Sequence, residues 1–160
     1  MVAPVVLSAP VPPDLTHSQV WQGLQIKARN EVGFMPAFLE CQPLGTANAT
    51  TGSFLRRSKM QELHSGDPVE VVEEVTEFSP TMVHYRRFDN AAEVFNTISR
   101  DPKTGELVLT FSYHLKFSQV PGSPDEEELY QKARRSIYET NCLMKTLGRI
   151  RRLVAEGTLG

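Results

Sequence analysis

The residue types that most often carry out chemistry are widely spaced in this sequence, and their spacing excludes several kinds of site. The two cysteines, Cys41 and Cys142, have no CxxC spacing, and we expect reduced thiols rather than a disulfide framework. No GxGxxG, GxxxxGKS or GxxxxGKT pattern offers a phosphate loop, and no Gly-x-Ser-x-Gly pattern offers a hydrolase nucleophile. The histidines show neither HxH nor HExxH spacing, at positions His17, His64, His84 and His114. The sequence therefore predicts no metal and no cofactor, which leaves acid–base chemistry by ordinary polar side chains.

Strand parity predicts where such side chains meet, because successive strand residues point to opposite faces. On the last predicted strand the residues of one face are apolar: Leu109, Phe111, Tyr113, Leu115 and Phe117. If residues 102–105 form a four-residue hairpin loop, Asn96 lies opposite Phe111, and Val94 and Ile98 share its inward face. Asn96 would then bind a substrate oxygen or pair with a neighbouring side chain. The phenol of Tyr113 would donate a proton or simply pack.

The predicted hairpin over residues 69–88 has two charged faces, and periodicity does not decide which one is inside. With a two-residue turn at residues 79–80 or 80–81, one face holds Val72, Glu74, Thr76, Phe78, Val83, Tyr85 and Arg87. The other holds Val71, Glu73, Val75, Glu77, Met82, His84 and Arg86. We favour the first as the inner face because it carries Phe78 and Tyr85. Glu74 and Arg87 would then form a charged pair at a cavity wall, with Glu74 as a base, although an exposed cross-strand pair fits the same pattern.

The elements that position these residues follow from the change of hydrophobic period along the chain. Residues 2–11 predict a strand, and residues 16–29 predict a helix in which Thr16 and Gln19 form a capping box. Residues 34–40, with Pro36 in the first turn, predict a second, short helix. Gly, Pro, Asn and Asp then separate six predicted strands, at residues 42–49, 53–62, 69–78, 81–88, 93–100 and 107–117.

A single long helix is predicted near the C-terminus, over residues 125–156. One stripe of its surface is predominantly apolar: Leu129, Ala133, Ile137, Thr140, Met144, Leu147, Ile150 or Arg151, and Val154. Acidic residues at its start and arginines at its end suit the helix dipole. We expect this stripe to face the apolar side of the sheet and to enclose a cavity with it.

Length and composition limit the class of protein. The 160 residues, with 40% apolar and 22% charged side chains, predict one folded domain over residues 1–160. The 17 basic and 19 acidic residues give a formal net charge of -2, which argues against a nucleic-acid partner. The apolar start has no basic region, and no stretch reaches the ~20 apolar residues of a membrane span. We therefore expect a cytoplasmic protein with no membrane partner.

The order of strand, two helices, six strands and long helix resembles the helix-grip fold of the SRPBCC superfamily, which includes START domains and birch-pollen-allergen proteins. Local motifs resemble its AtaL-like subfamily, known from fungal secondary-metabolite clusters and some bacteria: LTHSQVWQGL at 15–24, FMP at 34–36, FLRR at 54–57, FSPT at 78–81, VFN at 94–96 and GELVLTF at 105–111. The resemblance spans nearly the whole chain. It implies an α+β fold, a curved antiparallel sheet of about seven strands wrapped around the C-terminal helix with a cavity between them. It also implies a polyketide-cyclase-like or hydrophobic-ligand-binding protein.

Two functions from different classes fit these features. The first is a cofactor-free enzyme of secondary metabolism, a cyclase, isomerase or lyase that cyclises, isomerises or dehydrates a hydrophobic oxygenated substrate of polyketide-like or aromatic type. The second is a carrier that binds such a small molecule unchanged; a protein-interaction domain has little support, and a homodimer stays open. Convergent titratable groups in the cavity would favour catalysis. The predicted catalytic residues are Asn96, Tyr113, Tyr85, Glu74 and Arg87, and the predicted substrate contacts are Phe111, Leu109, Val94, Ile98, Ile137, Thr140, Met144 and Leu147.

Overall fold

The computed structural model describes residues 3–63, 65–117 and 125–160, and within them the chain forms seven strands and three helices. The strands are β1 (Val5–Pro10), β2 (Phe38–Leu44), β3 (Ser53–Gln61), β4 (Pro68–Phe78), β5 (Met82–Arg87), β6 (Glu93–Arg100) and β7 (Leu107–His114). The helices are α1 (His17–Arg29), α2 (Glu126–Thr140) and α3 (Cys142–Ala155). Residue Val2 of the first predicted strand, and His64, lie outside the described residues.

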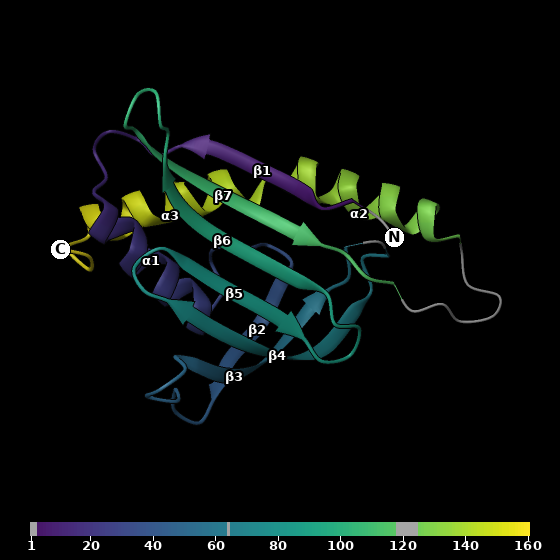
Figure 1. Cartoon of the computed structure of the whole chain (residues 1–160). Coiled ribbons are helices and arrows are strands. Elements are labelled where there is room, and N and C mark those ends of the chain that lie inside the picture. The colour runs from purple at the N-terminus through teal and green to yellow at the C-terminus, as the bar shows by residue number, and fades with distance from the viewer. Residues whose placement is uncertain (1–2, 64, 118–124) are drawn as a thin grey trace.

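The strands form one antiparallel sheet in the order β1-β7-β6-β5-β4-β3-β2 (Figure 1). Figure 1 shows α2 and α3 following one another beside β1 and β7, and α1 contacts α3, β5 and β6. At the crossing of α1 and α3, a Cβ on Gly23 would lie 2.4 Å from Ile150 Cγ1, so a glycine is needed for this close approach. The core fills the space between the helices and one face of the sheet, as the helix-grip prediction requires.

Helix α1 begins and ends where the sequence predicts. The capping box is formed: Thr16 Oγ1 accepts from the Gln19 backbone N–H at 3.2 Å, and Gln19 Oε1 accepts from the Thr16 N–H at 2.9 Å. At the other end, the Asn30 N–H donates to the Ile26 carbonyl at 3.0 Å. The helix turns Val20 and Leu24 fully inward, which fixes the face it presents to the sheet.

The short helix predicted at residues 34–40 is wrong. The Phe34 and Met35 N–H groups donate to the Glu31 carbonyl in a turn, and the chain then enters β2. This strand pairs with β3, with Cys41 opposite Ser58, and it replaces the strand predicted at residues 42–49. A short apolar run fits a helix or a strand equally well by periodicity, and pairing with β3 supplies partners for its backbone groups.

The C-terminal helix is two helices rather than the continuous one predicted over residues 125–156. Asn141 adopts the left-handed conformation (φ 46°, ψ 60°), which ends α2 and starts α3. Its N–H donates to the Ile137 carbonyl at 3.0 Å, and its Oδ1 accepts from the Met144 N–H at 3.4 Å. The break rotates the apolar stripe, so that Leu143 is buried while Met144 is 51% exposed.

The two central hairpins test the predicted strand faces. Between β6 and β7, Asn96 lies opposite Phe111 and Val94 opposite Tyr113, as predicted. Between β4 and β5, Phe78 lies opposite Met82, so the connection has three residues and not two. An odd loop length reverses the parity of one strand relative to the other. The inner face therefore combines one predicted set on β5 with the opposite set on β4: Val83, Tyr85 and Arg87 with Val71, Glu73 and Val75.

Candidate functional site

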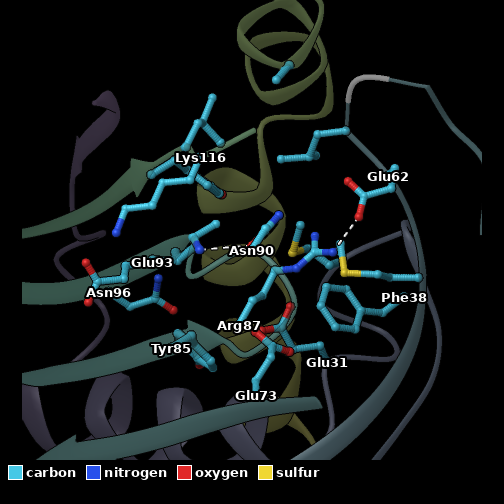
Figure 2. A pocket seen from close by; sticks show the side chains of 18 of the residues that line it. Glu31, Phe38, Glu62, Glu73, Tyr85, Arg87, Asn90, Glu93, Asn96 and Lys116 are labelled. Carbon is cyan, nitrogen blue, oxygen red and sulfur yellow. Dashed lines mark hydrogen bonds and ion pairs between the residues drawn. The ribbon is translucent and has the colours of Figure 1, made fainter. Parts of the chain in front are cut away.

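A pocket opens on the inner face of the sheet and reaches α1, with about 800 Å³ of space free of protein atoms, counting the part open to solvent. Figure 2 shows Glu31, Glu73, Tyr85 and Asn96 converging on it. Its wall is largely apolar, with Met35, Phe38, Met60, Leu63, Val94, Leu115 and Phe117 among its residues. Four charged side chains at the pocket are almost fully buried, and we name them the charge cluster: Lys27, Glu31, Arg56 and Glu73.

Arg56, from β3, is the centre of the charge cluster and is 1% exposed. Its Nη2 donates to Glu31 Oε1 at 2.8 Å and to Glu73 Oε1 at 3.0 Å, and its Nε donates to Glu73 Oε1 at 3.1 Å. Its Nη1 donates to the carbonyl oxygens of Lys27 at 3.4 Å and Ala28 at 3.0 Å, which belong to the last turn of α1. Because these carbonyls lack helical partners, the guanidinium fastens the end of α1 to β3 and β4.

Lys27 joins the charge cluster to the polar residues of the sheet. Its ammonium donates to Glu31 Oε1 at 3.2 Å and to Asn96 Oδ1 at 3.1 Å. It also lies 5.0 Å from the ring centre of Tyr85 and 5.1 Å from that of Phe111, within cation–π range. One buried cation thus connects α1 with β5, β6 and β7.

Burial and neighbouring charge set the protonation of the residues at the pocket. Burial raises the pKa of Glu31, but the charges of Lys27 and Arg56 and their hydrogen bonds outweigh it and hold the pKa below its ordinary value. Burial, and then the charge of Glu31, raise the pKa of Tyr85 well above its ordinary value. At neutral pH the pocket therefore presents an ionised Glu31 and a neutral Tyr85 phenol.

Tyr113 lies beside Cys142, the first residue of α3. Burial raises the pKa of the Tyr113 phenol well above its ordinary value, and Cys142 raises it further. Burial also raises the pKa of the Cys142 thiol. The two groups share a side-chain hydrogen bond, and both are protonated at neutral pH. A protonated thiol is a poor nucleophile, so Cys142 acts here as a packing and hydrogen-bonding group.

Arg87 occupies another part of the pocket wall, near Glu62 (Figure 2). Its Nη2 donates to Glu62 Oε1 at 2.6 Å and to Asp89 Oδ2 at 2.5 Å. Although burial lowers the pKa of Arg87, its bonds to Asp89 and Glu62 raise it above its ordinary value. The hydrogen bond from Arg87 lowers the pKa of Asp89 in turn, so this part of the wall carries a guanidinium held between carboxylates.

Apart from Glu74, the residues predicted for the site fall into three groups in the structure. Asn96, Tyr85, Tyr113, Arg87 and Val94 line the pocket, on the inner face as strand parity predicts. The predicted contacts Leu109, Phe111, Ile98 and Leu147 are buried in the core and do not line the pocket. The remaining predicted contacts line two grooves outside this pocket. Ile137 and Thr140 line a groove that Tyr113 also lines. Met144, again with Thr140, lines a second groove beside Gly148.

Glu74 does not belong to the site, and its predicted pairing with Arg87 is wrong. Its Oε1 accepts from Arg86 Nη2 at 3.4 Å on the outer face, where both side chains are more than one-third exposed. The three-residue loop between β4 and β5 is the cause, because it puts Glu73 and not Glu74 on the face of Tyr85. The inner carboxylate of β4 is therefore Glu73.

Sequence reasoning missed three members of the charge cluster, Lys27, Glu31 and Arg56, and had Glu73 only on the face that it did not favour, although two signals were present. Lys27 continues the helical spacing of Val20 and Leu24, which puts a charge on the apolar face of α1, and Glu31 follows at the same spacing just after the helix ends. Arg56 alternates with Phe54 and Met60 on β3, where it occupies an inward position among apolar residues. A charged residue on an apolar stripe is the pattern that indicates a buried ion pair.

Within the described part of the chain, no group of three or more His, Cys, Asp or Glu side chains is arranged to hold a metal ion. None of the described helices is long and apolar enough to cross a membrane.

The chain is similar to known proteins in sequence pattern and in fold. The family model described as acetylaranotin biosynthesis cluster protein L, AtaL, matches residues 3–157. No curated protein matches the chain significantly. The Zhui aromatase/cyclase from Streptomyces sp. R1128 has a similar fold, with a TM-score of 0.66 and 14% identity over 95% of this chain and 94% of that one. A protein from Thermus thermophilus gives a TM-score of 0.65 and 13% identity over 94% and 98%. The di-domain aromatase/cyclase StfQ of the steffimycin pathway gives 0.61 and 10% over 97% of this chain and 52% of that one.

Proposed function

The chain belongs to the AtaL family of secondary-metabolite cluster proteins, within the SRPBCC superfamily, and we propose that it is a cofactor-independent enzyme acting on a hydrophobic oxygenated metabolite in this pocket. One observation carries the proposal. Ionisable side chains from α1, the turn after it and five strands converge on one largely apolar pocket. Catalytic sites concentrate such groups, whereas a carrier needs few of them.

The residue roles follow from the atoms available. The amide of Asn96 and the neutral phenol of Tyr85 bind a substrate carbonyl oxygen, and they hold the negative charge that develops there when a proton leaves the adjacent carbon. Glu31, which is ionised and accepts from the same Lys27 ammonium as Asn96, receives that proton. Lys27 and Arg56 hold the charge of Glu31 and orient it, and Tyr113 supplies a second phenol. Proton abstraction beside a carbonyl is the common first step of cyclisation, isomerisation and dehydration of oxygenated chains.

The aromatase/cyclase descriptions of two proteins of similar fold support cyclisation as the reaction. The proposal also takes the protein to be a single-domain cytoplasmic protein with a hydrophobic small molecule as its partner. The formal net charge of -2 supports the absence of a nucleic-acid partner.

An extract of a strain that lacks the gene provides the substrate for a test. The purified protein is incubated with that extract, and mass spectrometry follows which compound disappears. Cyclisation and isomerisation leave the mass unchanged and alter retention, whereas dehydration removes one water. We expect Tyr85→Phe and Asn96→Ala to slow the conversion by about 10²–10⁴-fold. Glu74→Gln is the matched control, because this carboxylate lies on the outer face, and it should convert at the wild-type rate.

Carriage is the second candidate, and one observation favours it. The members of the charge cluster bind one another, as they would in a framework that only shapes a pocket. Two results together would establish carriage and refute the catalytic proposal. A compound would co-purify with the protein and be released with its mass and retention unchanged, and the protein would convert nothing in the extract.

A further inference from the structure

Three polar atoms around Lys27 are buried and have no hydrogen-bond partner among the residues that the structure describes: Glu31 Oε2, Tyr85 Oη and Asn96 Nδ2. All three residues line the pocket, and all three approach the Lys27 ammonium, two by hydrogen bonds and one by its ring. Buried polar groups nearly always have partners, because an unpaired one costs roughly 1–3 kcal/mol. Three unpaired atoms at one place therefore indicate where a ligand binds.

The chemistry of Lys27 fixes the orientation of the Asn96 amide. An ammonium group can only donate hydrogen bonds, so the atom 3.1 Å from it must be the amide oxygen. The free atom of Asn96 is then the NH₂ group, a donor, which requires an acceptor on the ligand.

Glu31 imposes the opposite requirement. Its Oε1 receives bonds from Lys27 and Arg56, and its Oε2 is an acceptor of an ionised carboxylate. A ligand that binds there must offer an O–H or N–H donor. The Tyr85 phenol is neutral and can donate or accept, so it pairs with either kind of group.

The charge of the site excludes one class of ligand. The charge cluster has two cations and two anions, so its charges balance without an ionic ligand. The ionised Glu31 also repels an anion at the place where the ligand must offer a hydrogen-bond donor.

Met35 and Met60 line the same pocket. These unbranched thioethers can change rotamer at low cost and so admit a ligand to the three atoms.

Resting on the function proposed above, we infer that the pocket selects a neutral hydroxy-ketone, a molecule whose hydroxyl donates to Glu31 and whose carbonyl accepts from Asn96. Simple probes of this class are the three hydroxyacetophenone isomers. Their methoxy analogues lack the donor, the corresponding ethylphenols lack the carbonyl, and the hydroxybenzoates carry a charge.

Isothermal titration calorimetry at pH 6 compares the affinities of the wild-type protein for these probes. We expect the best hydroxyacetophenone to have a dissociation constant at least about tenfold lower than its methoxy and ethyl counterparts, because each of these leaves a buried group unpaired. The hydroxybenzoates should bind more weakly still. Equal affinity for a hydroxyacetophenone and its methoxy analogue, tighter binding of the hydroxybenzoates, or no binding of any hydroxyacetophenone would overturn the inference.

Two variants make the test specific to the pocket. Tyr85→Phe removes a hydroxyl that has no protein partner among the described residues, so the fold should keep its melting temperature while hydroxyacetophenone affinity falls about tenfold. Tyr138→Phe is the matched control, because Tyr138 is 77% exposed on α2, and it should leave both unchanged. An equal effect of the two variants on affinity contradicts the inference.

These binding results are separate from turnover. Probe selectivity without conversion of the extract would refute the catalytic proposal and leave the hydroxy-ketone site in place. Conversion of the extract without probe selectivity would refute the hydroxy-ketone site and leave the catalytic proposal in place.

Discussion

The two faces of the sheet carry the same kinds of charged residue in opposite surroundings. Arg56 on the inner face pairs with Glu73 at 3.0 Å, with exposed side-chain fractions of 1% and 7%. Their chain neighbours point outward: Arg57 pairs with Glu70 at 3.4 Å, and Glu74 pairs with Arg86 at 3.4 Å, all well exposed to solvent. A shift of one residue along a strand therefore moves a charge from water into the protein interior.

The burial of the inner charges argues against stability as their main role. Ions lose several kcal/mol of hydration on burial, and apolar residues of similar volume often serve the fold equally well. Outer pairs cost little and contribute little. The charge cluster is better explained by the pocket that it borders, where it holds Glu31 ionised and orients Asn96 through Lys27.

Removing the central cation of the inner face should destabilise the protein strongly. Arg56→Met leaves Glu31 and Glu73 with one buried cation fewer, and we expect a loss of about 3–5 kcal/mol in the free energy of unfolding. Arg57→Met, its outward neighbour, should stay within about 0.5 kcal/mol of wild type. Urea unfolding followed by circular dichroism and by the fluorescence of Trp21 measures both. Similar small losses in the two variants would remove the distinction between the faces.

Replacing the whole charge cluster by apolar residues separates its effect on stability from its effect on the pocket. In the variant Lys27→Met, Glu31→Leu, Arg56→Met and Glu73→Leu, no buried charge is left unpaired. We expect a free energy of unfolding near wild type or about 1–4 kcal/mol above it, together with loss of conversion of the extract. A quadruple variant less stable than Arg56→Met alone would show that the cluster mainly holds the fold together.

Acid should remove the stability that the ionised Glu31 contributes to the inner face. The pKa of Glu31 is lowered in the folded protein, whereas an unfolded glutamate titrates near about 4.3. A lowered folded pKa contributes stability that is fully present above the unfolded value and is lost as the pH falls through the folded one. The difference in unfolding free energy between wild type and Glu31→Gln should therefore be constant above about pH 5 and shrink below it. A difference that stays the same down to pH 3 would contradict the role of the Glu31 charge.

Most of the fold could be predicted from the sequence because its signals are local. The capping box of Thr16 and Gln19 and the four-residue loop between β6 and β7 depend on neighbouring residues alone, and both are confirmed. The prediction that Asn96 shares the inner face with Tyr113 followed from that loop. The break at Asn141 was missed because asparagine is tolerated within a helix and is also the residue that adopts the left-handed conformation most readily after glycine.

The site was harder to predict because its chemistry depends on contacts between distant segments. One unpredicted residue in the loop after Phe78 exchanged Glu74 for Glu73. Arg56 and Lys27 are separated by 29 positions along the chain and meet only when the end of α1 docks on β3. Periodicity shows that each charge lies on an apolar face, but not which opposite charge will meet it.

The outer pair of Glu74 and Arg86 should contribute little to stability. At 3.4 Å and with 37% and 41% of their side chains exposed, these residues interact through water as well as with each other. A double-mutant cycle of Glu74→Gln and Arg86→Met should give a coupling of about 0.2–1 kcal/mol, because solvent screens the charges and fixing two long side chains costs entropy. About 1 M salt should reduce it further, since the screening length then falls to about 3 Å. Urea unfolding of the four proteins at low and high salt measures the coupling. A salt-independent coupling above about 2 kcal/mol would mean that the outer face holds its charges as firmly as the inner one. The contrast between the two faces would then no longer hold.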